Sequence, residues 1–299
     1  MSNEDSPLAL DWEVTSYLYE AEEYFRLGQY RDALDVTSRA CTMARERHGD
    51  STLLLATALT DMGVCHKELG QYDEALEAHS EALTIRKKLL GDSHPHTILS
   101  LSNLGTVHEA IGDFRLAEQR YRYVVQMRSK ILDACDPAHG TSLNNLGLLL
   151  FRKGDFQEAI ECLRQAVGIR KTALGTHAAD YAQSLDNLAG CYVEMGDYKP
   201  AEAMQREAME VRRQACGEEH AEFANSLLQL GNLYWRIGDY CRAEQFAVRA
   251  LDIRCRTLGD THTHVAATLD LLSAIHQAKG NFERAVETCH RATEVRQKA

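Results

Sequence analysis

The sequence predicts an all-α fold in which seven helix pairs stack into a right-handed superhelical solenoid. Glycine followed by a polar residue and then Tyr or Phe recurs every 42 residues, with no insertion or deletion between copies. Alanine stands five residues after each of these anchor glycines, and apolar and small residues recur three and four apart on both sides of it, which is the spacing of helices. The anchor glycines are Gly28, Gly70, Gly112, Gly154, Gly196, Gly238 and Gly280.

The first helix of each pair precedes the anchor glycine. In the fifth repeat we expect it to run from about Ser184 to Met195. A small residue stands seven positions before the anchor, where the backbone of the partner helix crosses closely. Gly63, Gly105, Gly147, Ala189 and Gly231 occupy this position in five of the repeats.

The second helix begins about three residues after the anchor and ends at another glycine, as at Leu90 and Gly91. The same terminating glycine recurs at Gly49, Gly175, Gly217 and Gly259. We therefore predict a lead-in over residues 1–13 and a single repeat domain over residues 14–299. Its repeats are 14–55, 56–97, 98–139, 140–181, 182–223, 224–265 and 266–299.

The pattern of a small residue, G-x-[YF]-x-x-A and a further alanine resembles the tetratricopeptide repeat, whose usual period is about 34 residues. The longer period, with segments such as Ser100 to Arg122, Ser184 to Arg206 and Ala82 to Thr97, is similar to the kinesin light chain type of repeat. The resemblance covers nearly the whole chain and implies a repeat fold with a peptide-binding role. It does not imply a place in a motor, because kinesin light chains hold the motor chain through a long heptad segment, and residues 1–13 are too short for one.

Charge and cysteine content exclude several classes of function. The chain has 33 Lys and Arg against 44 Asp and Glu, a net charge of -11, and no long basic block, so we expect no nucleic acid and no membrane insertion. The nine cysteines form no CxxC pair, which argues against a disulfide framework or a zinc knuckle. Residues 1–13 are acidic and lack the apolar core of a signal peptide, so we expect a cytoplasmic protein.

No motif for nucleotide binding, metalloprotease or serine hydrolase chemistry is present, so we expect no catalysis, no cofactor and no metal. Two series of residues have alternative interpretations. Histidines near the loops between repeats could form a metal site, although capping of helices or exposure to solvent is the favoured interpretation; they are His94, His96, His177, His220, His262 and His264. Arginines sixteen after the anchors could bind phosphate or carboxylate, although a structural role is favoured, in which the stem covers the next helix and the head pairs with an acid; they are Arg86, Arg128, Arg170, Arg212, Arg254 and Arg296.

The candidate binding surface is the groove lined by the first helices, at positions thirteen, ten, nine, six, three and two before each anchor. The fourth repeat contributes Asn144, Asn145, Phe151 and Arg152, and the sixth contributes Gln229, Asn232, Trp235 and Arg236. Amides, an aromatic ring and a cation suit an extended peptide with an apolar anchor beside an acid. The alternative is that Phe151 and Trp235 only pack between repeats. Acids at equivalent positions, including Asp61, Asp186 and Glu194, make the groove mixed in sign.

Asn103, Asn145 and Asn187 stand nine residues before three successive anchors and predict a line of amides along the groove. An Asn side chain both donates and accepts, so it can bond a peptide backbone without reading its sequence. The kinesin light chain resemblance implies the same role, since similar asparagines occur in that family. The alternative is that these amides bond to each other or to adjacent helices.

Two functions from different classes follow. The first is an adaptor or scaffold that binds a partner peptide in the groove. The second is a structural subunit held permanently in a larger assembly through convex faces or repeat ends. Ala299 lies two residues short of the position for a seventh terminating glycine, so we expect the last repeat to be incompletely covered and to contact another copy, a partner or a further segment.

Overall fold

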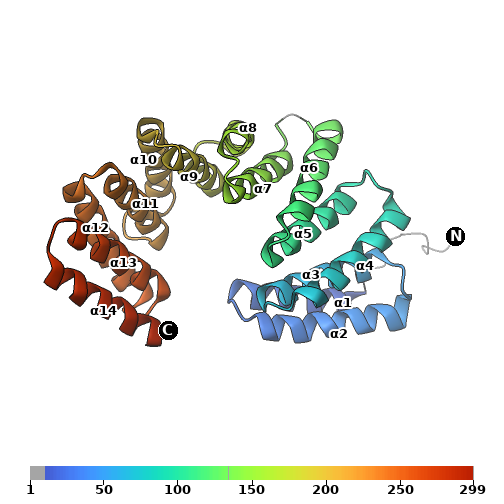
Figure 1. Ribbon diagram of the computed structural model, residues 1–299. Helices are drawn as coiled ribbons and strands as arrows, with labels where there is room; N and C mark the ends of the chain where they lie inside the picture. Colours follow the sequence, from blue (N-terminus) through green and yellow to red (C-terminus); the bar gives the residue numbers. More distant parts are fainter. Residues whose placement is uncertain (1–10, 134, 299) are drawn as a thin grey trace. The chain divides into compact units, whose positions relative to one another are not determined.

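The computed structural model describes residues 11–133 and 135–298, and its secondary structure in these ranges is entirely helical (Figure 1). The helices follow one another in pairs, which confirms the predicted fold class. They are α1 (Trp12–Arg26), α2 (Tyr30–His48), α3 (Leu53–Glu68), α4 (Tyr72–Leu90), α5 (Pro95–Ile111), α6 (Phe114–Ile131), α7 (Pro137–Lys153), α8 (Phe156–Leu174), α9 (Ala179–Glu194), α10 (Tyr198–Cys216), α11 (Ala221–Ile237), α12 (Tyr240–Leu258), α13 (Thr263–Ala278) and α14 (Phe282–Lys298).

The chain forms two compact units, residues 1–133 with α1 to α6 and residues 134–299 with α7 to α14. The single domain over 14–299 therefore stays a prediction. Residues 1–10 of the predicted lead-in lie outside the described residues, and α1 already begins at Trp12. The first helices also begin earlier than the predicted repeat boundaries, because α3 starts at Leu53 and α5 at Pro95, where Thr52 and His94 cap them.

The glycines end the helices as predicted. Gly91 follows α4 with a φ of 85°, a conformation that residues with a Cβ rarely adopt, and its N–H bonds to the carbonyl of Lys87. The third repeat differs, since α6 ends at Ile131 before an extended Leu132. Here Asp133 stands where other repeats have the terminating glycine, and it is the last residue of the first unit.

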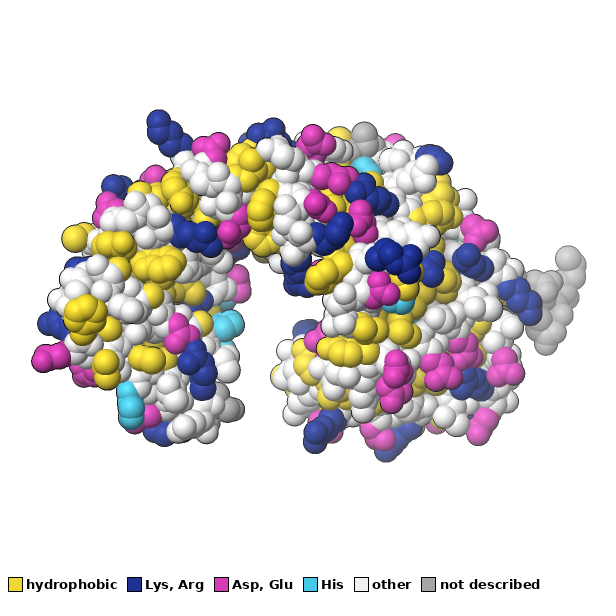
Figure 2. Space-filling view, viewed as in Figure 1, with side chains coloured by type: hydrophobic (Ala, Val, Ile, Leu, Met, Phe, Trp, Pro, Cys, Tyr) yellow, Lys and Arg dark blue, Asp and Glu magenta, His cyan; other side chains and the backbone are white. Residues whose placement is uncertain are grey.

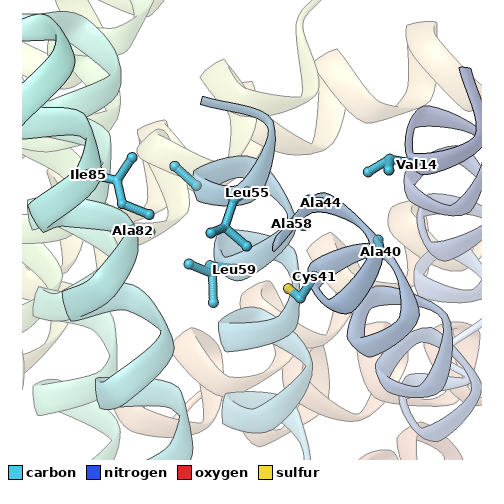
Figure 3. Packing of buried hydrophobic residues seen from close by; sticks show 10 residues of the cluster. Val14, Ala40, Cys41, Ala44, Leu55, Ala58, Leu59, Ala82 and Ile85 are labelled. Carbon is cyan, nitrogen blue, oxygen red and sulfur yellow. The ribbon is translucent and has the colours of Figure 1, made fainter. Parts of the chain in front are cut away.

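Each pair buries apolar side chains against the next pair. In the first unit, a cluster with Val14 of α1, Ala40 of α2, Leu55 and Leu59 of α3 and Ile85 of α4 is almost inaccessible to solvent (Figure 3). Leu55 and Leu59 are one turn apart, so the same face of α3 contacts both neighbouring second helices. Burial of such side chains stabilises the fold by about 1.5–3 kcal/mol each.

The first helices line one side of each unit. α1 contacts α3, α3 contacts α5, α7 contacts α9 and α11 contacts α13, whereas second helices of neighbouring repeats make no comparable contact in the described chain. The side formed by the first helices is therefore the tighter one within each unit. We refer to it below as the first-helix face.

Candidate functional site

A cavity of about 560 Å³ opens on the first-helix face of the second unit, between α9 and α11. The backbones of these two helices make no contact comparable to that of α11 with α13, and the cavity lies between them. Its walls carry Gln183 and Asn187 from α9 and Asn225, Leu228 and Gln229 from α11. The cavity thus has four amide side chains on its walls, beside charged residues and apolar residues such as Leu228 and Val211.

The floor of the cavity is formed by an arginine from the second helix α10. Arg212 Nη2 pairs with Asp186 Oδ2 of α9 at 2.6 Å, and Nη1 donates to Ser226 Oγ of α11 at 2.7 Å. Its Nε lies 3.6 Å from Glu222 Oε2. Burial raises the pKa of Asp186, while the nearby Arg212 opposes this rise. Arg212 therefore bridges the two first helices and pairs with an acid beneath the opening.

Arg254 of α12 reaches the same cavity from the following repeat. Its Nη2 donates to Asn225 Oδ1 at 2.6 Å, and its Nη1 donates to Thr268 Oγ1 at 2.6 Å and to the carbonyl of His264. Burial lowers the pKa of its guanidinium. Because its donors are used by α11 and α13, Arg254 holds Asn225 in place.

Arginines sixteen residues after the anchors join neighbouring repeats through hydrogen bonds. Each member of four pairs donates from Nη1 to a hydroxyl fourteen residues later, in the first helix of the next repeat. The pairs are Arg86 with Ser100, Arg170 with Ser184, Arg212 with Ser226 and Arg254 with Thr268. All four arginines are buried, which confirms the structural interpretation for them. The expected partner acid is found for Arg212 and for the exposed Arg296, which pairs with Asp270.

The predicted amides are placed in different ways. Asn187 and Gln229 stand at the same repeat position and line the same cavity. Asn144 is only 4% exposed, and its Oδ1 accepts from Asn187 Nδ2 at 3.0 Å and from Ser184 Oγ. The predicted groove position ten before the anchor is thus buried in this repeat, because it faces the neighbouring first helix. For Asn144 and Asn187 the alternative interpretation, in which amides bond to each other, holds.

The remaining predicted residues lie on three first helices. Asn103 on α5 and Asn145 on α7 are half-buried, and so is Phe151, whose ring lies 5.7 Å from that of Phe156. Arg152 is exposed at the end of α7.

On α11, Asn232, Trp235 and Arg236 are exposed. Trp235 retains 37% of its surface, so packing between repeats does not consume its ring. Arg236 Nη2 pairs with Glu194 Oε1 of α9 at 2.6 Å. On the face drawn in Figure 2, cations and anions are interspersed over both units.

Sequence reasoning missed part of the cavity lining. Gln183 stands thirteen before its anchor, at a predicted groove position, but neither it nor Glu222 was singled out, and Arg212 was given only a structural role, with its head paired with an acid. The sequence did contain a signal for Arg212, because its side chain reaches Asp186, which stands one residue before Asn187 in the groove pattern.

The loop histidines cap helices. His94, His220 and His262 each accept through Nδ1 from the backbone N–H two residues later, at the start of α5, α11 and α13. This confirms capping for these three. Within residues 11–133 and 135–298, no group of three His, Cys, Asp or Glu side chains could hold a metal, and no helix combines the length and apolar character needed to cross a membrane.

The stacked helix pairs define the class of helical repeat proteins, and comparison identifies the family. The tetratricopeptide repeat profile matches residues 54–130, 139–214, 201–256 and 222–298, and a second tetratricopeptide repeat profile matches 102–173. The chain belongs to the tetratricopeptide repeat family. No enzyme family is indicated by these matches, and a comparison with curated proteins finds no relative.

Solved structures support the more specific resemblance. BtubC (BKLC) from P. vanneervenii is 25% identical, with a TM-score of 0.65 over 76% of this chain and 91% of that one. A putative kinesin light chain with nearly identical TPR-like repeats from Podosopora anserina is 23% identical, with a TM-score of 0.62 over 68% and 95%. The quorum sensor NprR from B. thuringiensis shares the fold at 13% identity and a TM-score of 0.77 over 97% and 77%. The resemblance to kinesin light chain-type repeats is confirmed.

Proposed function

We propose that this protein is a non-catalytic adaptor that binds an extended peptide segment of a partner protein on its first-helix face. The observation that carries the proposal is the cavity between α9 and α11, with amides on its walls and the Arg212–Asp186 ion pair at its floor. A structure of the Rap conjugation regulator of plasmid pLS20, which has the same fold at 16% identity, contains the Phr* peptide. A cytoplasmic location is part of the proposal.

Free amides make the cavity suitable for a peptide backbone. Among the described residues, Gln183 and Gln229 have no hydrogen-bond partner, and both are exposed on opposite walls. An amide side chain donates and accepts, so each can bond one peptide unit. Leu228 offers an apolar contact between them. This surface binds backbone more readily than it selects a sequence.

We assign selectivity for the partner's sequence to two residues at the C-terminal end of α11, Trp235 and Arg236. Trp235 presents an exposed ring, and aromatic rings of this kind are frequent anchors in interfaces. Arg236 is held by Glu194, so an acid of the partner would bind by sharing or displacing that ion pair. Asn145, Phe151 and Arg152 of α7 are proposed to extend the binding surface within the second unit. Asn103 of α5 is proposed to contact a peptide on the first-helix face of the first unit.

The test uses peptides selected from a random twelve-residue display library against the whole chain. We expect enriched peptides whose affinity, measured by fluorescence anisotropy, falls about fivefold in Gln229→Ala, because one hydrogen bond to the backbone contributes about 1 kcal/mol. Asn187→Ala is expected to weaken binding and also to lower the melting temperature slightly, because Asn187 bonds Asn144.

The matched control is Gln245→Ala, which removes an exposed amide from the second helix α12. It should change neither affinity nor stability. Equal affinity of parent, Gln229→Ala and Asn187→Ala for every selected peptide would exclude this cavity as the binding site.

A second function is favoured by the exposed apolar residues of α14. Phe282 and Val286 retain 67% and 70% of their surface and lie one turn apart on the same helix face. A structural subunit held in an assembly through its last repeat would bury them. On the purified chain, this alternative can be tested as contact between the α14 faces of two copies.

A further inference from the structure

A second cavity, of about 540 Å³, lies on the first-helix face of the first unit, between α1 and α3. Its walls are mostly apolar, with Leu18, Tyr19 and Phe25 from α1 and Val64 from α3. Two carboxylates, Glu22 of α1 and Asp61 of α3, also line it. Within one small space, apolar walls therefore meet two negative charges.

Asp61 is a half-buried carboxylate that the described residues leave without a hydrogen bond or an ion pair, although Arg86 of α4 acts on it at longer range. Arg86 directs its Nη1 to Ser100 Oγ at 2.7 Å instead. Burial raises the pKa of Asp61 to about 6, and the nearby Glu22 adds to the rise. Carboxylates withdrawn from water are normally paired, because an unpaired one costs stability. This cost calls for a compensating contact that the chain itself does not provide.

The position of Asp61 in the repeat points to a ligand contact. It stands nine residues before its anchor, where later repeats have Asn103, Asn145, Asn187 and Gln229. Gln229 and Asn187 line the cavity of the second unit, so the same repeat position faces a cavity in both units. An acid replaces the amide only in the repeat whose cavity has the second carboxylate, Glu22.

We propose that the cavity between α1 and α3 binds the lysine or arginine side chain of a peptide partner, with the charged head beside Asp61 and Glu22. The methylene stem packs against Leu18, Phe25 and Val64, as such stems do on apolar surfaces. The exposed Tyr19 ring adds a face on which a cation is attracted. The inference rests on the proposed function, because it specifies one residue of the peptide that the protein binds.

The experiment compares peptides selected from a random display library against the whole chain and against Asp61→Asn. We expect selected peptides to share a position occupied by Lys or Arg in the parent selection and not in the variant selection. Replacing that residue by norleucine, which keeps the stem and removes the charge, should weaken binding to the parent about tenfold. The same replacement should have little effect on binding to Asp61→Asn, since the two changes remove one interaction.

Two controls separate this site from general attraction between a basic peptide and an acidic protein. Asp73→Asn removes one exposed charge from α4 of the same unit and should leave the preference unchanged. Glu22→Gln changes an exposed residue of the cavity and should weaken binding of the basic peptide in the same direction as Asp61→Asn. Circular dichroism melting establishes that each variant is folded.

The outcomes distinguish this inference from the function on which it rests. If peptides are enriched without a basic position, or bind Asp61→Asn as tightly as the parent, the basic subsite is wrong and the adaptor function stands. An apolar residue at the Asp61-dependent position would equally overturn it. If no peptide is enriched against any form of the chain, the adaptor function fails and the subsite fails with it.

Discussion

At the scale of single residues, His79 makes the stability of the fold depend on pH. Its side chain is 1% exposed, its ring faces Gly63, and its Nδ1 has no hydrogen-bond partner among the described residues. Burial lowers the pKa of His79 to about 4, and the positive charges of Lys67 and Arg86 act in the same direction. The folded protein therefore keeps this histidine neutral where an unfolded chain would protonate it.

We predict that this histidine makes the protein less stable as the pH falls. Between the unfolded pKa of 6.5 and the folded value of about 4, the unfolded state binds the additional proton, so the free energy of unfolding decreases by about 3 kcal/mol over this window. His79→Leu, which introduces the residue type that Leu163 provides at the same repeat position, should remove that loss. Urea denaturation of both forms at pH 7 and pH 4.5 measures the difference.

Asp61 changes the free energy of unfolding in the opposite direction as the pH falls. Because its pKa is raised in the folded state, the folded protein binds a proton at Asp61 more readily than the unfolded chain does between about pH 6 and 3.8. For this reason the comparison of parent and His79→Leu is informative, whereas the pH dependence of the parent alone is not. If the free energy of unfolding decreases equally in the parent and in His79→Leu, the role assigned to His79 is wrong.

At the scale of elements, close helix contact explains which residue stands seven before each anchor. A Cβ on Gly63 would lie 2.7 Å from His79 Cε1, one on Gly105 2.6 Å from Tyr121 Cε1, and one on Gly147 2.6 Å from Leu163 Cγ. In these three repeats the side chain nine residues after the anchor occupies the space that a Cβ would need, so the position seven before the anchor requires glycine.

We predict opposite effects for two glycine-to-alanine changes. Gly63→Ala should lower the free energy of unfolding by about 1–2 kcal/mol, because the methyl group overlaps the His79 ring in a packed interface. Gly168→Ala, in the interior of α8 with no atom within 4 Å of the added Cβ, should raise it by about 0.5–1 kcal/mol. Chemical denaturation of the two variants measures both; stabilisation by Gly63→Ala would disprove the contact argument.

The repeat period made the elements predictable. The anchor glycines adopt positive φ between paired helices, and Gly91 ends α4 as predicted, since one short signal is repeated in every copy. The candidate site was less predictable, because its features depend on differences between copies. Asn144 is buried, and the gap between α9 and α11 depends on how far two helices stand apart, which no single residue encodes.

At the scale of the whole molecule, the exposed face of α14 predicts self-association. Phe282 and Val286 together offer an apolar surface whose burial contributes about 1.5–3 kcal/mol per side chain. We expect the sedimentation coefficient to rise with protein concentration, and Phe282→Ser with Val286→Ser to abolish the rise. Val248→Ser, at a 52% exposed valine of α12, is the control and should behave like the parent. If the sedimentation coefficient of the parent does not depend on protein concentration, the predicted self-association is wrong.

The contacts between helices also have a consequence for how the protein folds. Within each unit a helix makes its substantial contacts with the next helix along the chain or the next but one. The loops that must close during folding are therefore short, and the entropy lost on closing them is small. We expect each repeat to acquire its structure soon after it leaves the ribosome, against the repeat synthesised before it, without waiting for distant parts of the chain.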